Sequence, residues 1–287
     1  MKICVPFKNK SKSSAIADEL LITVNSLSTM RLFENNDIDE KYLEKHLIFS
    51  FTSNMIEKID PETAAAFYHK INCKKKSLRL EIGKTNPFKY YDKWFTVLGD
   101  NNVNFFIDTP AVDWNDLNMF KMLPVTEVYV AEDLAFSLTK ATTALHNVGK
   151  RVRIYPNVVQ SKYNNLYTDY SCFFIRPEDM YLYEPFIDTL EFWGVQNNAL
   201  SWINIYSKNR NWAGKLKEII IGFHTDVDNR YIGKDFGLNR IDCGRRCIQP
   251  ESKCNRCDFW IHAAMGRSET AKFVKEIEEQ IETMSNG

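Results

Sequence analysis

EVYVAEDLAFSLTKATTALHNVGKRVRIYPN, residues 127–157, contains two short apolar runs on either side of a longer amphipathic segment. The runs at 127–132 and 151–157 have the composition of buried strands, whereas the apolar residues of 133–149 recur every three or four positions. An aspartate begins this middle segment and a glycine ends it, as is common for an α-helix. The stretch therefore predicts a strand–helix–strand unit, which is the building block of a parallel sheet.

The same alternation continues along most of the chain. Candidate strands lie at 2–7, 19–25, 47–53, 77–83, 104–109, 127–132, 151–157, 172–177 and 189–194, and candidate helices at 61–73, 88–99, 114–123 and 133–149. Successive strands begin about 17 to 30 residues apart, which suits one unit of an eightfold (β/α) barrel. We therefore expect an α/β, TIM-barrel-like fold with a C-terminal four-cysteine metal-binding loop. Residues 1–287 would form a single barrel-like domain, with 195–262 as an insertion and tetracysteine segment.

The composition excludes several classes of protein. The 287 residues contain 37 basic and 37 acidic side chains, so net charge gives no indication of nucleic-acid or membrane binding. No apolar run approaches the roughly 18 to 20 residues of a membrane span, and the start MKICVPFKNK lacks the apolar core of a signal peptide. Because the seven cysteines are an odd number, they cannot form a fully paired disulfide framework. We predict a cytoplasmic protein with reduced thiols and no membrane partner.

Four of the cysteines lie close together in the run DCGRRCIQPESKCNRCD, with the spacing C-x3-C-x6-C-x2-C: Cys243, Cys247, Cys254 and Cys257. Two close pairs of thiols on a short loop can converge on one metal ion or one iron–sulfur cluster. A tetrahedral zinc site and a 4Fe-4S cluster both accept four thiolates. The short connection between the two pairs is tight for a zinc ribbon, which favours the cluster, with zinc as the alternative.

Basic and aromatic residues surround these thiols. Arg245 and Arg246 lie between the first two cysteines, and Trp260 follows the last one. Cations near a tetrathiolate site offset its negative charge, which is one interpretation of the arginines. The alternative is a substrate-binding patch in which the arginines contact phosphate and Trp260 stacks on an unpaired base.

Polar residues recur near the carboxyl ends of the candidate strands: Asn25, Glu81, Asp108, Glu132, Asn157, Arg176 and Glu191. In a parallel barrel these ends share the face that carries active sites. We predict Glu81, Asp108, Glu132 and Arg176 as catalytic residues, because carboxyl groups exchange protons and an arginine holds an anionic group. Asn157 is predicted to bind substrate. Metal binding by the carboxylates is one alternative. The other is that each of these polar residues has no function and lies at a strand end only because a polar loop begins there.

The segments ADELLITVN, EVYVAEDLAFSL followed by KRVRIYPNVVQS, FFIRPED and TLEFWG resemble barrel segments of the collagenase-like peptidase family. The resemblance covers about two thirds of the chain, although Cys243 follows the last segment later than the family's cysteines do. It implies an iron–sulfur enzyme that takes part in hydroxylation of RNA bases or of small aromatic substrates, with a 4Fe-4S cluster on the four cysteines. The alternative is a non-catalytic binding or assembly protein with a structural zinc site and a protein partner.

Overall fold

The structure is a computed structural model that describes most of the chain up to Phe192 and a few short segments beyond it. The described residues are 1–7, 12–34, 39–82, 87–111, 114–130, 138–156, 177, 180–192, 203–206, 214–215, 231–232 and 276. The four-cysteine segment and nearly all of the candidate strand at 172–177 lie outside these residues. The assignment of the whole chain to a single domain stays a prediction.

Strands and helices alternate in the described part of the chain. The strands are β1 (Lys2–Pro6), β2 (Glu19–Val24), β3 (His46–Phe51), β4 (Lys75–Leu80), β5 (Phe105–Ile107), β6 (Glu127–Tyr129), β7 (Arg151–Ile154) and β8 (Thr189–Glu191), with a separate antiparallel pair of β9 (Gly214–Lys215) and β10 (Tyr231–Ile232). The helices are α1 (Lys12–Ile16), α2 (Leu27–Glu34), α3 (Glu40–Leu43), α4 (Ser53–Ile56), α5 (Pro61–Lys70), α6 (Pro87–Asp100), α7 (Trp114–Met122), α9 (Leu138–His146) and α11 (Met180–Tyr183), followed by the 3-10 helix η2 (Glu184–Phe186). The four predicted helices correspond to α5, α6, α7 and α9.

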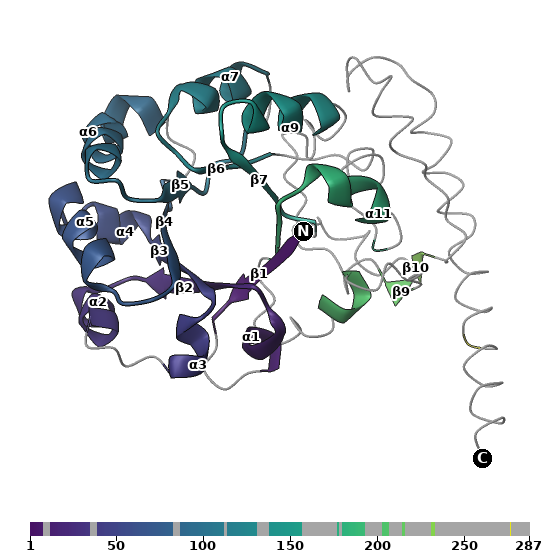
Figure 1. The fold of residues 1–287 in the computed structure, drawn as a ribbon, viewed down its shortest axis with the longest axis horizontal. Coiled ribbons are helices and arrows are strands. Elements are labelled where there is room, and N and C mark those ends of the chain that lie inside the picture. Colours follow the sequence, from purple (N-terminus) through teal and green to yellow (C-terminus); the bar gives the residue numbers. More distant parts are fainter. Residues whose placement is uncertain are drawn as a thin grey trace.

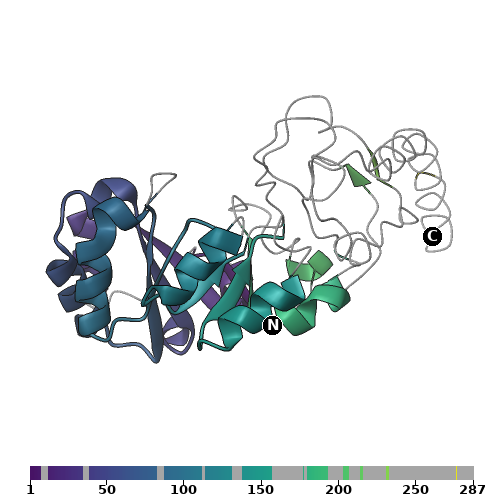
Figure 2. The same ribbon diagram turned by 90° about the horizontal axis from the view of Figure 1, so that it is seen from above.

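Strands β1 to β8 form one parallel sheet in the order β5-β4-β3-β2-β1-β8-β7-β6. The edge strands β5 and β6 also meet, because the Thr126 N–H donates to the Phe105 carbonyl at 2.8 Å and the Ala111 N–H donates to the Tyr129 carbonyl at 2.7 Å. The sheet is therefore a nearly closed ring with helices on its outside (Figure 1). Figure 2 shows the same ribbon turned by 90° about the horizontal axis, so that the ring is seen from its side. The described residues therefore confirm an α/β fold with a nearly closed, TIM-barrel-like ring of eight parallel strands.

The ring separates two buried regions, because successive side chains of a strand point to opposite faces. The larger region lies between strands and helices and includes Leu20, Phe49 and Leu80. The smaller apolar cluster consists of Cys4, Leu21, Ile48, Phe106 and Tyr129, which come from five different strands of the ring. The other buried strand residues that point into the ring are polar or charged. These residues form the candidate site.

Helix α5 begins where the sequence predicts. The Asp60 side chain accepts a hydrogen bond from the Thr63 N–H at 2.6 Å, and Pro61 occupies the first turn, where its missing N–H costs no hydrogen bond. This hydrogen bond lowers the pKa of the Asp60 carboxyl. Among the described helices, none combines the length and the apolar composition that crossing a membrane requires.

The turn that closes helix α9 after His146 contains a glycine with a left-handed backbone. Gly149 has a φ of 74°, and its N–H donates to the His146 carbonyl at 2.9 Å. A Cβ at this position would meet no atom within 4 Å, so backbone strain is the main cost of replacing the glycine. We expect Gly149→Ala to lower the free energy of unfolding by about 1 kcal/mol.

Gly149→Asn is the matched variant, because asparagine tolerates the left-handed conformation better than alanine does. Urea unfolding followed by circular dichroism should show a smaller loss in the free energy of unfolding for Gly149→Asn than for Gly149→Ala. Equal stability of Gly149→Ala and the parent chain would contradict the assignment of Gly149 as the residue that ends the helix.

Candidate functional site

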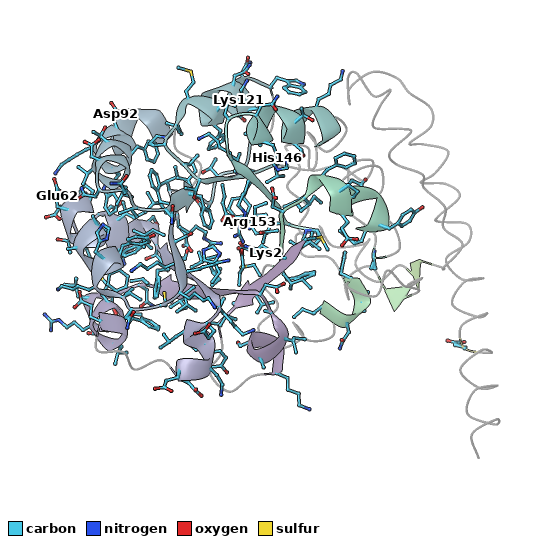
Figure 3. The ribbon with its side chains drawn as sticks, viewed as in Figure 1. Lys2, Glu62, Asp92, Lys121, His146 and Arg153 are labelled. Carbon is cyan, nitrogen blue, oxygen red and sulfur yellow. The ribbon has the colours of Figure 1, made fainter. Side chains whose placement is uncertain are left out.

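Charged side chains and the smaller apolar cluster together occupy the interior of the ring. Figure 3 shows Arg153 inside the ring of strands, whereas Glu62 and Asp92 lie on the outer helices. Arg153 and Glu19 have no exposed side-chain surface, and their strands, β7 and β2, are not neighbours in the sheet. Their ion pair therefore crosses the interior. Buried charges are stable only where they are paired and hydrogen-bonded, so the contacts of each group decide what it can do.

In the interior, one guanidinium connects three carboxylates: two of them begin strands β2 and β6, and the third ends β8. The Arg153 Nη2 atom lies 2.5 Å from Glu19 Oε2 and 2.7 Å from Glu127 Oε2, and its Nη1 atom lies 3.0 Å from Glu191 Oε2. Arg153 also packs over the Phe106 ring, with 4.9 Å between the guanidinium carbon and the ring centroid. Burial alone would lower the pKa of Arg153, but the adjacent carboxylates outweigh burial and raise it. The guanidinium is therefore held in its charged form.

Among the described carboxylates, Glu19 contacts the most basic side chains. Its Oε1 atom lies 3.0 Å from His46 Nδ1 and 3.2 Å from Arg151 Nη2, in addition to the contact of Oε2 with Arg153. The imidazole is fixed on its other side, where His46 Nε2 lies 2.8 Å from the Ser77 hydroxyl. Burial would raise the pKa of Glu19, but Arg153 and the hydrogen bond from His46 lower it well below its ordinary range.

Glu19, His46 and Glu127 place potential metal-ligand atoms within 4.8 Å of one another. Both carboxylates already accept from guanidinium groups, since Arg151 Nη1 lies 2.9 Å from Glu127 Oε1 and Arg153 binds both residues. A divalent cation at this position would lie against two fixed positive charges. We therefore assign this group to a structural ion-pair network and place no metal there.

At the carboxyl ends of the strands, Arg79 of β4 is the central residue. Its Nε atom donates to the Ser50 hydroxyl at 2.8 Å, Nη1 to Glu191 Oε1 at 2.6 Å and Nη2 to Glu81 Oε1 at 2.8 Å. Burial alone would lower the pKa of Arg79, but Tyr129, Tyr155 and the two glutamates raise it. Arg79 is thus a buried cation shared between two carboxylates.

The predicted catalytic residues Glu81 and Asp108 lie just beyond neighbouring strands, β4 and β5. Glu81 Oε1 accepts from the Ser50 hydroxyl at 2.6 Å as well as from Arg79, whereas Asp108 Oδ1 accepts from the Ile82 N–H at 2.9 Å. Burial raises the pKa of Asp108, and the nearby Glu81 charge adds to this rise. The structure therefore brings together two carboxyl groups whose surroundings differ: one beside a guanidinium, the other partly desolvated.

Two tyrosines complete this end of the barrel. The rings of Tyr129 and Tyr155 stack with centroids 4.6 Å apart and an interplanar angle of 8°. The Tyr129 hydroxyl donates to Glu191 Oε2 at 2.6 Å. Burial and the Glu191 charge raise the pKa of both tyrosines. Both phenols therefore keep their protons at neutral pH.

The structure does not describe the other predicted site residues. These are the catalytic candidates Glu132 and Arg176, the substrate-binding candidates Asn157, Arg245, Arg246 and Trp260, and the metal ligands Cys243, Cys247, Cys254 and Cys257. Their roles stay predictions. Glu81 and Asp108 are the two predicted catalytic residues whose positions the structure describes, and it brings them together.

Apart from Glu191, which was among the predicted polar strand ends, the charged residues inside the strands were missed by the reasoning from sequence. Their signal is a strict alternation of charged or polar residues with apolar ones, as in Arg79-Leu80-Glu81 and Arg151-Val152-Arg153. In an open sheet, this alternation indicates that one face of the sheet is exposed to water. In a closed ring, it indicates that the interior of the ring is polar. Recognising the closure together with the alternation would have identified Arg79 and Arg153.

Comparison with known families and with curated proteins found no match. Among solved structures, the chain is similar to a conserved protein of unknown function from Enterococcus faecalis, with a TM-score of 0.42 and 7% identity over 72% of this chain and 66% of that one. It is also similar to an uncharacterized B. cereus protein, with a TM-score of 0.42 and 8% identity over 73% of this chain and 64% of that one. The chain thus spans slightly less than two thirds of the length of these two structures.

Proposed function

We propose that this chain is an enzyme whose proton-transfer chemistry takes place at the carboxyl end of the barrel, with Asp108 as the group that exchanges the proton and Glu81 as the carboxylate that holds the substrate. The observation that carries the proposal is their placement on adjacent strands in unlike surroundings. Two carboxyl groups with unlike surroundings can take opposite roles, one staying charged while the other exchanges a proton. The carboxyl ends of the strands are also where barrel enzymes carry their active sites.

Within this proposal the two residues have separate tasks. The contacts of Glu81 Oε1 with Arg79 and Ser50 orient the carboxylate and offset its charge. Asp108 has a raised pKa, which makes it a better proton acceptor than an ordinary aspartate and, once protonated, the proton donor. Glu81 would hold the substrate, and Asp108 would exchange the proton with it.

The proton-transfer role of Asp108 has a direct physical test. Carbon-13 NMR titration of the side-chain carboxyl groups should give Asp108 a pKa above the ordinary value of about 3.9 for aspartate. Glu81→Gln should lower the Asp108 pKa, because the Glu81 charge contributes to its rise. Glu62→Gln, a change on the outer helix α5, should leave it unchanged. An Asp108 pKa at or below the ordinary value would remove the basis for this role.

The four cysteines and the family resemblance extend the proposal to an iron–sulfur enzyme. Four thiols are a donor set that a 4Fe-4S cluster accepts, and a bound cluster would supply electron transfer. The resemblance to collagenase-like peptidases suggests an RNA base or a small aromatic compound as substrate. In such a hydroxylation a C–H bond becomes C–OH, and an oxygen-atom donor acting as co-substrate is reduced by the two electrons that the substrate carbon loses.

Cluster binding is tested by purifying the full chain without oxygen. We expect a brown protein with iron and inorganic sulfide in equal amounts, and Cys254→Ser should lose most of both. Cys73→Ser is the matched control, because this half-buried thiol donates to the Lys75 carbonyl at 3.5 Å and lies in the barrel part of the chain. A colourless preparation with one zinc ion per chain would refute the cluster.

Activity is tested by nucleoside mass spectrometry of RNA from cells that produce the chain. We expect a hydroxylated nucleoside with the parent chain and none with Asp108→Asn or Cys254→Ser. A product that persists in Asp108→Asn would show that this carboxyl group is not needed.

A second candidate is a non-catalytic binding or assembly protein with a structural zinc site. The observation that favours it is that Arg79 and Arg153, the buried guanidinium groups of the described residues, are fully paired, which makes the barrel interior a stable framework. Under this alternative, removing zinc should lower the melting temperature, because metal binding and folding are coupled. Asp108→Asn should then change no activity.

A further inference from the structure

One buried guanidinium divides its hydrogen bonds between two carboxylates. Arg79 Nη1 donates to Glu191 Oε1 at 2.6 Å, whereas Arg79 Nη2 donates to Glu81 Oε1 at 2.8 Å. An arginine commonly binds a single carboxylate through two parallel hydrogen bonds, one to each oxygen. Here Glu81 receives a hydrogen bond from one terminal nitrogen, and the other terminal nitrogen is taken by Glu191. Glu191 therefore limits how much of the Glu81 carboxylate Arg79 can bind.

Glu191 is itself fixed by contacts that do not involve Glu81. Its side chain has no exposed surface, and its Oε2 atom lies 3.0 Å from Arg153 Nη1 and accepts from the Tyr129 hydroxyl at 2.6 Å. The Tyr129 hydroxyl also lies 3.4 Å from Arg79 Nη1. A buried carboxylate that left these partners would lose the cations that offset its charge, so Glu191 is a fixed anchor for the Nη1 end of Arg79.

A further hydrogen bond of Arg79 fixes the plane of its guanidinium. The Nε atom donates to the Ser50 hydroxyl at 2.8 Å, and that hydroxyl donates to Glu81 Oε1 at 2.6 Å. Because a guanidinium is planar, the contacts of Nε and Nη1 determine where Nη2 points. Both hydrogen bonds that Glu81 accepts from described side chains end on Oε1. The Glu81 side chain is 28% exposed, whereas that of Arg79 is 5% exposed, so Glu81 is the charged end of this group that faces outward.

We propose that Glu191 is a positioning residue for the proposed reaction: it holds the Nη1 end of Arg79, so that Arg79 binds one oxygen of Glu81 and leaves the second oxygen to the substrate. Without the Glu191 charge, Nη1 would turn toward Glu81 and the guanidinium would bind both oxygens of that carboxylate. The inference rests on the proposed function, in which Glu81 holds the substrate. It adds a buried residue of β8 that acts on Glu81 through Arg79.

Nitrogen-15 NMR of Arg79 in the full-length protein tests whether its guanidinium is held in this way. Rotation about the Cζ–Nε bond exchanges Nη1 and Nη2, so we expect two separate signals in the parent chain. In Glu191→Gln the two signals should approach each other or merge, because both nitrogens then face one carboxylate. Glu127→Gln is the matched control: it also removes a buried carboxylate from Arg153, at 2.7 Å, and should keep the Arg79 signals of the parent chain.

The effect on the reaction is measured by the nucleoside mass spectrometry described above. We expect Glu191→Gln to form about tenfold less hydroxylated nucleoside per folded chain, because the substrate would lose a charge-assisted hydrogen bond to Glu81. Glu127→Gln should form as much product per folded chain as the parent does. A purely structural role of Glu191 would leave both the product per folded chain and the Arg79 signals unchanged.

Several results would overturn the inference. A single averaged Nη signal in the parent chain would do so, and this measurement does not require that Glu191→Gln folds. Unchanged Arg79 signals in Glu191→Gln would do so as well. Product that is lost in Asp108→Asn but retained in Glu191→Gln would overturn the role of Glu191 and leave the proposed function standing. Product that persists in both variants would overturn both proposals.

Discussion

Arg153→Met should be among the most damaging single substitutions in the described barrel, with a loss of about 3 to 5 kcal/mol in the free energy of unfolding. The side chain has no exposed surface and binds three carboxylates, Glu19, Glu127 and Glu191. Methionine fills a similar volume but carries no charge, so those carboxylates would stay buried without their shared cation. Chemical unfolding monitored by circular dichroism at neutral pH measures the loss.

Two further variants separate charge from packing. Lys93→Met removes one member of an exposed ion pair with Glu62, and exposed pairs contribute little, so its unfolding midpoint should barely move. Adding Glu191→Gln to Arg153→Met removes one of the stranded charges, so the double variant should lose less than the sum of the single losses. Additive losses would show that the contact between Arg153 and Glu191 carries no coupling energy.

The second large effect is a loss of stability in acid that depends on Glu19. Because the folded-state pKa of Glu19 is lowered below its ordinary value of 4.5, the unfolded chain binds a proton more readily than the folded one. The stabilisation from this group is therefore complete above about pH 5 and declines as the pH falls below the unfolded-state pKa near 4.5. One such proton corresponds to a slope of about 1.4 kcal/mol per pH unit.

The measurement is a series of urea unfolding curves between pH 7 and pH 3. Glu19→Gln is less stable at neutral pH, since His46, Arg151 and Arg153 lose their shared carboxylate, but its stability should depend less steeply on pH below about 4. Glu44→Gln, which changes an exposed partner of Lys74, should keep the slope of the parent chain. The same slope in Glu19→Gln as in the parent chain would contradict the role assigned to Glu19.

Much of the architecture could be predicted because it is encoded locally. Apolar runs separated by amphipathic segments predicted strands β1 to β8, and local features such as Asp60-Pro61-Glu62 and Gly149 predicted helix ends that the structure confirms. The positions of Glu81 and Asp108 were also predictable, since both follow apolar runs, and in a parallel barrel the ends of such runs lie on one face.

The sequence by itself therefore determined the order of the elements and the face on which Glu81 and Asp108 lie, whereas the tertiary structure decided what surrounds those two residues. Arg79 meets Glu191 across 112 positions of sequence, and Arg153 meets Glu19 across 134. Such pairs depend on the closure and stagger of the ring, which place side chains of non-adjacent strands against one another. Because desolvation sets the pKa of Asp108 and the guanidinium of Arg79 fixes the contacts of Glu81, the chemistry of the site follows from that closure.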